Sequence, residues 1–70
     1  MIERLKATRI DHDETQEELA KAIGFHRVQI ARYETGKSTP PINFIIAFCN
    51  HYHVSSDYIL GLPKHLNRPR

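Results

Sequence analysis

Apolar residues along the chain recur at intervals of three and four, without a run of strict alternation, so the pattern predicts helices and no strands. Polar clusters, glycines and prolines interrupt this periodicity and divide it into short segments. The predicted helices cover Ile2 to about Arg9, Gln16 to about Ile23, about Arg27 to Glu34 or Thr35, about Ile42 to His51 or Tyr52, and the residues after Ser55 up to Leu60. The sequence therefore predicts an all-α protein.

The second helix has the clearest boundaries. Thr15 and Glu18 are spaced as a capping box, in which the Thr15 hydroxyl accepts from a backbone N–H and Glu18 returns the bond. Gly24 is typical of the residue with positive φ that follows a helix. His26 holds the N-cap position of the third helix and caps poorly, so we expect Gln29 to reach back to the backbone instead.

Helical spacing also predicts which side chains form the core. The residues expected to face inward are Ile2, Leu5, Leu19, Ala20, Ile23, Ile42, Ile45, Cys49 and Tyr52. Two interpretations remain open for Phe44 and Phe48. In the first, both side chains lie away from the core and form a partner surface with Ile59 and Leu62. In the second, Phe48 completes the core.

Length and composition describe one soluble domain, with 70 residues, 40% of them hydrophobic and 26% charged. We expect the domain to occupy residues 1–62 and a loose basic tail to occupy residues 63–70. Cys49 is the only cysteine, which excludes an internal disulfide and fits a reducing cytoplasm. No targeting segment and no apolar run of about 18 residues occurs, so we expect a cytoplasmic protein without membrane contact.

Charge is distributed unevenly along the chain, although the formal net charge is only +2. Residues 1–20 carry a net −3, residues 21–37 a net +3 and residues 38–70 a net +2. The basic block coincides with the predicted third helix. A nucleic-acid partner and an ordinary solvated helix face explain this block equally well.

Two short helices joined by a turn with glycine are typical of a helix-turn-helix. Ala20 lies four residues before Gly24, where a small side chain allows the two helices to cross closely. A wider set of residues resembles the lambda-repressor-like (Cro/repressor, or XRE) helix-turn-helix family over about residues 2–62. That set is Arg4-Leu5-Lys6, Arg9, Thr15-Gln16-Glu17-Glu18-Leu19-Ala20, Gly24, Ile30, Tyr33-Glu34, Gly36-Lys37, Pro40, Ile45, Val54-Ser55, Asp57-Tyr58-Ile59 and Leu60-Gly61.

The resemblance implies a compact five-helix domain whose helix-turn-helix is formed by the second and third helices. It also implies that the third helix enters the major groove of double-stranded DNA. Arg27, Val28 and Arg32 match base-contacting positions. An arginine there can pair with guanine O6 and N7, and a valine can contact a thymine methyl group.

Other matching positions imply contacts to the DNA backbone or an architectural role. Gln16 matches a position that binds phosphate and often supports the first base-contacting residue, and Lys37 and Asn43 are further phosphate candidates. His26 departs from the small hydroxyl residue common in the family and is either a phosphate contact or an exposed loop histidine. Arg9 and Glu34 match an ion pair that connects the first helix to the end of the third.

Metal and enzyme sites are weaker alternatives. Cys49, His51 and His53 cluster in the sequence, but structural zinc requires four protein ligands. Ser55, His51 and Asp57 do not form a credible catalytic triad, because Ser55 is better explained as a helix cap. We therefore expect no enzymatic activity, no metal and no cofactor.

Two functions from different classes remain. The first is a sequence-specific transcription regulator, a repressor that binds a palindromic operator as a homodimer. The second is a protein-interaction module on the same fold, such as an antitoxin, with a toxin or antirepressor as its partner.

Overall fold

The computed structural model describes residues 2–61, which form five helices and, within this range, no strand. The helices are α1 (Ile2–Asp11), α2 (Gln16–Ile23), α3 (Arg27–Glu34), α4 (Ile42–Tyr52) and α5 (Ser56–Leu60). They confirm the predicted all-α fold, and α1 extends two residues past Arg9. The predicted tail at residues 63–70 lies outside the described residues.

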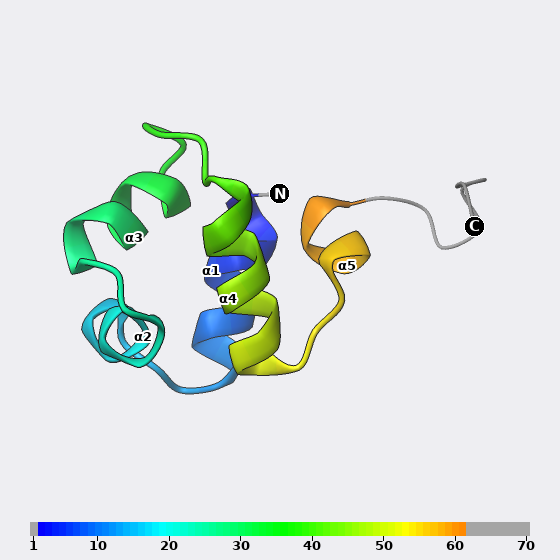
Figure 1. Ribbon diagram of the computed structural model, residues 1–70, viewed down its shortest axis with the longest axis horizontal. Helices are drawn as coiled ribbons and strands as arrows, with labels where there is room; N and C mark the ends of the chain where they lie inside the picture. The colour runs from blue at the N-terminus through cyan, green and yellow to red at the C-terminus, as the bar shows by residue number, and fades with distance from the viewer. Residues whose placement is uncertain (1, 62–70) are drawn as a thin grey trace.

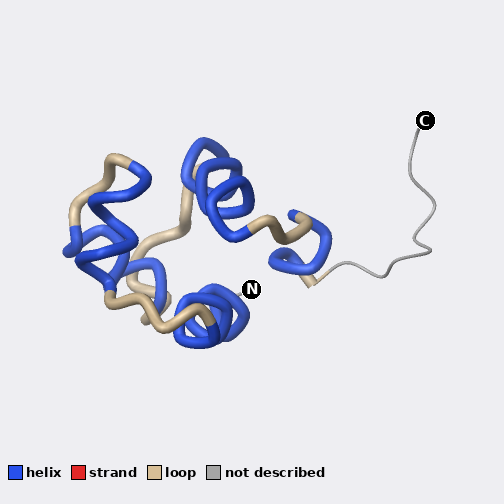
Figure 2. Tube along the Cα trace, turned by 90° about the horizontal axis from the view of Figure 1, so that it is seen from below, coloured by secondary structure: helices blue, strands red, loops and turns tan. Residues whose placement is uncertain are grey.

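The helices are arranged around a central pair. In Figure 1, α1 and α4 lie in the middle, α2 and α3 on one side of them, and α5 on the other. Figure 2, a view turned by 90°, again places α5 apart from α2 and α3. The helix-turn-helix and α5 therefore occupy opposite ends of the domain.

Local interactions explain where α2 begins and ends. The Glu18 amide donates to the Thr15 hydroxyl over 3.1 Å, and the Thr15 amide donates to the Glu18 carboxylate over 2.8 Å. Both halves of the predicted capping box are thus present, an interaction of about 1 kcal/mol. At the other end Gly24 takes φ 77°, and the Phe25 amide donates to the Ala20 carbonyl over 2.9 Å. The left-handed conformation of Gly24 turns the chain from α2 toward α3.

The start of α3 uses the predicted substitute for a cap. The Gln29 side-chain oxygen accepts from the His26 amide over 2.9 Å, which satisfies a donor at the helix start. His26 takes the extended conformation of an N-cap residue, with φ −100° and ψ 145°. The direction in which the chain enters α3 is therefore fixed, although the N-cap residue His26 is a poor helix cap.

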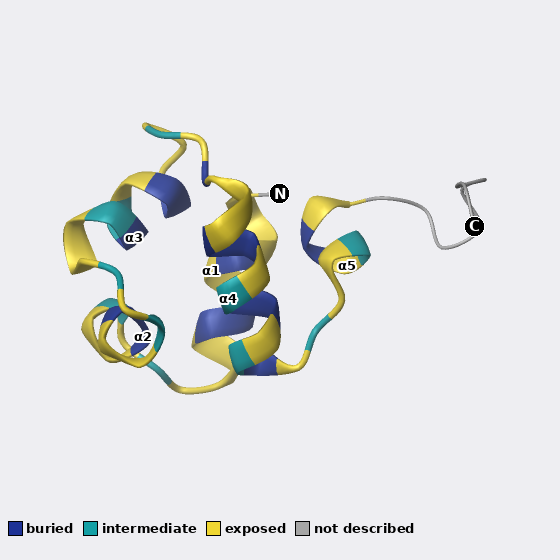
Figure 3. Ribbon diagram, in the orientation of Figure 1, coloured by how far each residue is buried: buried dark blue, intermediate teal, exposed yellow. Residues whose placement is uncertain are grey.

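The core is built from apolar side chains of all five helices (Figure 3). Phe44 lies at its centre, with ring centroids 5.2 Å from Phe25, 4.7 Å from Tyr33 and 5.7 Å from Phe48. The side chains with a relative exposure below 2% are Leu5, Leu19, Ile30, Phe44, Phe48 and Ile59. These contacts bring α2, α3 and α4 into one aromatic and aliphatic cluster.

The predicted inner face of α4 requires a correction. Phe44 and Phe48 are buried, with exposures of 1% and 0%, whereas Ile42 is 70% exposed. At about 100° per residue, the buried positions of α4 centre about a quarter turn away from Ile42. Ile2 is also 36% exposed, so its inward placement was wrong as well. Of the two interpretations left open, the structure confirms that Phe48 completes the core. Phe44 and Ile59 are buried as well and form no exposed partner surface, and Leu62 lies outside the described residues.

A buried ion pair connects α1 to α3. Arg9 donates to the two Glu34 carboxylate oxygens, from Nε over 2.7 Å and from Nη2 over 3.0 Å. Its Nη1 donates to the Glu14 carbonyl over 2.7 Å, so all three guanidinium nitrogens are bonded. The hydrogen bonds that Arg9 donates to Glu34 outweigh desolvation and raise the pKa of Arg9. Among the described residues, no buried side-chain nitrogen or oxygen lacks a partner.

A second polar cluster is formed by Glu14, His51 and Tyr52. The Glu14 carboxylate accepts from His51 Nε2 over 2.9 Å and from the Tyr52 hydroxyl over 2.8 Å. Partial burial would raise the pKa of Glu14, but the hydrogen bonds from His51 and Tyr52 outweigh it and lower that pKa. Burial is the larger cause that raises the pKa of Tyr52, and the hydrogen bond to the Glu14 carboxylate is the next. The cluster thus joins the α1–α2 loop to the end of α4.

The residues considered for a metal site are otherwise occupied. Cys49 is 8% exposed in the core, where burial raises the pKa of its thiol. His51 bonds to Glu14, and His53 ends α4 with φ 57°. In residues 2–61 no group of three or more histidine, cysteine, aspartate or glutamate side chains is placed to hold a metal ion. None of the described helices has the length and apolar character needed to cross a membrane.

Breaking the Arg9–Glu34 pair should destabilise the domain. We expect Glu34→Ala to lower the free energy of unfolding by about 3 kcal/mol, because it leaves the Arg9 guanidinium buried without its counter-charge. Urea denaturation measures the change. Glu17→Ala removes an exposed carboxylate 3.7 Å from Lys21 and should stay within about 0.5 kcal/mol of the wild type. The apolar pair Arg9→Met/Glu34→Leu should restore most of the loss, and a double variant as unstable as Glu34→Ala would contradict this explanation.

The Glu14 cluster should make stability depend on acid pH. Because the pKa of Glu14 is lower in the folded state, its contribution is complete above the unfolded pKa of about 4.3. That contribution is lost as the pH falls through the folded pKa. We expect Glu14→Gln to lower the unfolding free energy by about 1 kcal/mol at pH 7, with a smaller difference below about pH 4. Unfolding from pH 7 to pH 3 tests this, with Glu17→Gln as control; a constant difference across that range would refute it.

Candidate nucleic-acid interface

Helix α3 buries one side and exposes the other. Ile30, Tyr33 and Glu34 face the interior, with exposures of 0%, 6% and 7%. The predicted base-contacting residues all point outward, since Arg27 and Arg32 are exposed and Val28 is 59% exposed. The exposed side chain of Val28 buries no apolar area in the free protein, but it can contact an apolar group of a ligand.

The region around α3 is positively charged at its surface. Between Gly24 and Asn50 the only acidic residue is Glu34, whose charge is neutralised by Arg9 in the interior. Arg27, Arg32 and Lys37 thus lie on a surface to which this segment contributes no exposed carboxylate. Such a surface attracts polyanions.

Helix α2 packs closely against α3. Ala20 is 3% exposed, and the segment from Gly24 to His26 is short enough to place the start of α3 directly beyond the end of α2. A Cβ built on Gly24 would meet nothing within 4 Å, so the glycine is needed for its positive φ of 77° and not for space.

Gln16, at the start of α2, approaches the end of α3. Its amide nitrogen donates to Glu34 Oε1 over 3.0 Å, and the residue is half-buried. The family resemblance implied support for the first base-contacting residue, but the structure connects Gln16 to the opposite end of α3. Glu34 therefore accepts hydrogen bonds from both α1 and α2. The sequence contained no signal for the Gln16–Glu34 bond, because 18 residues separate the partners.

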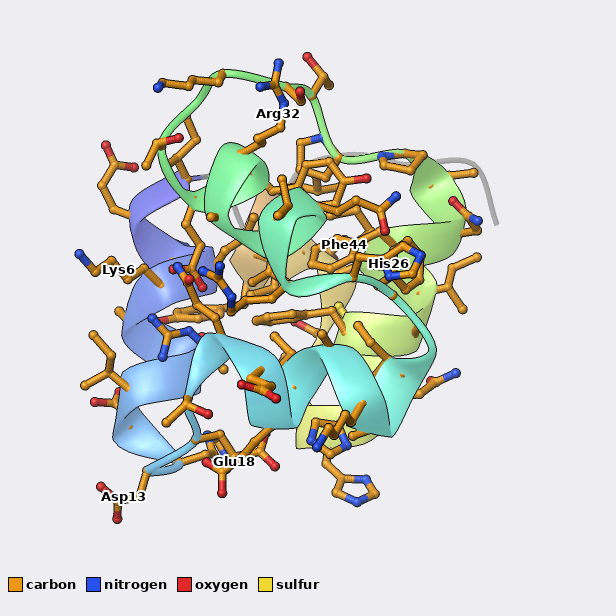
Figure 4. The ribbon with its side chains drawn as sticks, turned by 90° about the vertical axis from the view of Figure 1, so that its left-hand side faces the viewer. Lys6, Asp13, Glu18, His26, Arg32 and Phe44 are labelled. Atoms are coloured by element: carbon orange, nitrogen blue, oxygen red, sulfur yellow. The ribbon has the colours of Figure 1, made fainter. Side chains whose placement is uncertain are left out.

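The remaining phosphate candidates lie at the two ends of α3 and beyond it. Figure 4 shows His26 and Arg32 toward opposite ends of α3, with Phe44 in the space between the helices. Lys37 is exposed in the α3–α4 loop, and Asn43 is exposed in the first turn of α4, where its side-chain oxygen accepts from the Phe44 amide over 3.0 Å. The structure brings Lys37 near Arg32, since the Lys37 amide donates to the Arg32 carbonyl over 2.9 Å.

Sequence reasoning missed one residue at this surface. The Ser38 hydroxyl accepts from Arg32 Nε over 2.9 Å, so the loop after α3 touches a predicted base-contacting side chain. Ser38 is half-buried, whereas its neighbours Lys37 and Thr39 are exposed. The glycine at position 36 was the only local indication that the chain turns back at this point.

Comparisons with known proteins agree with this geometry. A family model described as helix-turn-helix matches residues 5–59. The chain is 38% identical over 60 residues to the uncharacterized HTH-type transcriptional regulator YobD of Bacillus subtilis, covering 86% of this chain and 54% of YobD. It is 38% identical over 63 residues to the antitoxin PezA of Streptococcus pneumoniae, covering 90% of this chain and 40% of PezA. The chain thus spans about half the length, or less, of these curated relatives.

A solved structure also has the same arrangement of helices. The P22 c2 repressor protein, in complex with the synthetic operator 9T in the presence of Tl+, superposes with a TM-score of 0.77 at 28% identity. The match covers 83% of this chain and 88% of the repressor chain. Together with the family match over residues 5–59 and the α2–α3 geometry, this likeness identifies the fold. The chain belongs to the XRE-type, Cro/repressor-like helix-turn-helix family.

Proposed function

We propose that this protein binds double-stranded DNA in a sequence-specific manner and regulates transcription, with α3 in the major groove. The observation that carries the proposal is the outward side of α3, where Arg27, Val28 and Arg32 are exposed and the segment from Gly24 to Asn50 adds no exposed carboxylate. A helix with an exposed arginine in its first turn can reach base edges when the groove admits it. The likeness to a repressor solved with its operator supports the same docking.

The three exposed residues of α3 have different roles in this proposal. Arg27 lies at the helix start and donates to guanine O6 and N7. Val28 contacts a thymine methyl group, since it offers no hydrogen bond. Arg32 lies one turn later on the side of Val28 and reads a further base or binds a phosphate.

Backbone contacts set the position of α3 on the duplex. The proposed phosphate contacts are Gln16, His26, Lys37 and Asn43, which surround α3 at the start of α2, at its own N-cap and in the segment after it. Gln16 uses one amide hydrogen for Glu34 and keeps the second for a phosphate. These contacts contribute affinity and register but read no sequence.

We propose a homodimer on a palindromic operator, acting as a repressor in the cytoplasm. The apolar residues Ile42 and Ile46 lie four apart on α4, with exposures of 70% and 54%. Residues 38–50 contain no charged side chain, so this side of α4 can face a second copy without like-charge repulsion. A two-fold dimer would place two α3 helices about 34 Å apart, one turn of DNA.

A second candidate function is binding of a protein partner, such as a toxin or an antirepressor. The 38% identity to an antitoxin favours it, and Ile42 and Ile46 are two of the exposed apolar residues that could make such a contact. The family and the fold are those of DNA-binding regulators and not of enzymes, so we assign no catalytic residue and no cofactor.

Selection of bound duplexes from a randomised DNA pool tests the main proposal. We expect the wild type to enrich a two-fold symmetric site with half-sites about 10 base pairs apart. Arg27→Ala should lose the preference for one base by about 5- to 100-fold, because a bidentate contact to guanine is removed. Arg32→Ala should relax a different position.

Arg4→Ala is the matched control, since it removes the same charge at the far end of the domain. Arg4 donates to the Tyr58 carbonyl over 2.7 Å and stacks 4.7 Å from the Tyr58 ring, beside α5 and away from α3 (Figure 1). It should leave every base preference unchanged. A folded wild type that enriches no sequence at low salt would refute DNA reading and favour the protein-partner function.

A further inference from the structure

Arg32 is held at both its backbone and its side chain by the loop that follows α3. The Lys37 and Ser38 amides donate to the Arg32 carbonyl over 2.9 and 3.2 Å. The Ser38 hydroxyl accepts from Arg32 Nε over 2.9 Å. Two neighbouring residues of one loop thus hold both the backbone and the side chain of Arg32. Arg27, by contrast, makes no side-chain hydrogen bond within the described residues.

The turn that brings Ser38 to Arg32 is constrained by the fold. Gly36 takes φ 79°, and a Cβ at this position would lie 2.9 Å from Ile2 Cδ1. Pro40 is buried, and Pro41 is the N-cap of α4. The loop is thus anchored on both sides of Ser38, first by packing against α1 and then by the start of α4, so the position of the hydroxyl is set by the tertiary structure.

The bond to Ser38 leaves the useful edge of the guanidinium free. Arginine carries five N–H donors, and only the Nε donor faces Ser38. The two terminal NH2 groups make no hydrogen bond within the described residues, and they form the planar pair that matches guanine O6 and N7 or two phosphate oxygens. A free arginine side chain loses rotamer entropy when it is ordered, and a side chain already held in place loses less on binding.

We infer that Ser38 is a positioning residue for base reading: it orients the Arg32 guanidinium toward the major groove before DNA binds. The inference rests on the proposed DNA-binding function and extends it to a residue that touches no base. It also assigns Arg32 to a base edge, one of the two partners that its terminal NH2 pair matches. Ser38 therefore determines specificity at one position of the site through Arg32.

The test combines duplex selection with binding measurements on the intact chain. The variants are Ser38→Ala, Ser38→Thr, Arg32→Ala and the double variant Arg32→Ala/Ser38→Ala, with Thr39→Ala as a control for loss of an exposed neighbouring hydroxyl. We expect Ser38→Ala to weaken preference by about 3- to 10-fold, the value of one hydrogen bond, at the position that Arg32→Ala relaxes. Ser38→Thr keeps the hydroxyl and should keep the preference. Adding Ser38→Ala to Arg32→Ala should change nothing further.

A second measurement tests the contact without DNA. In the NMR spectrum of the free protein, the Arg32 Nε–H should exchange slowly with water in the wild type and in Ser38→Thr. It should exchange rapidly in Ser38→Ala, while the amides of α3 remain protected. This readout separates a local loss of the hydroxyl from unfolding of the loop, which would expose many amides at once.

Three results would overturn the inference, and they are distinguishable. If Ser38→Ala weakens binding to all sequences equally, also in the Arg32→Ala background, then Ser38 contacts the DNA backbone itself. If the wild type enriches a site and Ser38→Ala enriches the same site with unchanged preference, the positioning role fails while DNA binding stands. If the wild type enriches no site, the proposed function fails and the role of Ser38 fails with it.

Discussion

The buried pair of Arg9 and Glu34 is the interaction on which the geometry of the domain depends. It joins the end of α1 to the end of α3, and Gln16 adds α2 to the same carboxylate. A domain of this size buries only about 60% of the surface of its unfolded chain, so its apolar core leaves considerable freedom in how the helices cross. Directional bonds at one carboxylate reduce that freedom. The contribution of the pair is therefore to fix one arrangement more than to add stability.

Because of this anchor, α3 can expose one whole side. Its end is held by Glu34, its start by the bond between Gln29 and His26, and its middle by Ile30 and Tyr33 in the core. Arg27, Val28 and Arg32 on the outward side are exposed and take no part in the core. The outward residues can therefore serve recognition, and a change there alters binding without a large loss of stability. Neutralising Glu34 inside the domain also leaves the outer surface basic.

The aromatic cluster around Phe44 has a complementary role. It places α4 against α2 and α3, so that the loop between α3 and α4 must turn back over Arg32. Gly36 is required at this turn for its φ of 79°, and the absence of a Cβ there also leaves room for the Ile2 side chain of α1. The surface near Arg32 is thus shaped by three helices that are distant in sequence, and a residue such as Ser38 acquires its role only in the folded chain.

The residues alone were enough to predict the five helices, the capping box of α2 and the turn at Gly24. Each depends on interactions within a few residues, or on a helical period that is visible in the order of side chains. The resemblance to a known family also pointed to Arg9 and Glu34, which the structure pairs. The base and phosphate contacts remain predictions.

The packing of the helices was needed to establish which apolar residues of α4 are buried, where Gln16 binds, and that Ser38 contacts Arg32. Helix α4 has more apolar residues than one buried stripe can hold, so the crossing of α2 and α3 selected Phe44 and Phe48 and left Ile42 and Ile46 outside. The bond between Glu14 and His51 joins residues 37 positions apart. Such contacts depend on the angles and distances between packed helices, and the pattern of a single chain carries no record of them because many packings satisfy the same periodicity.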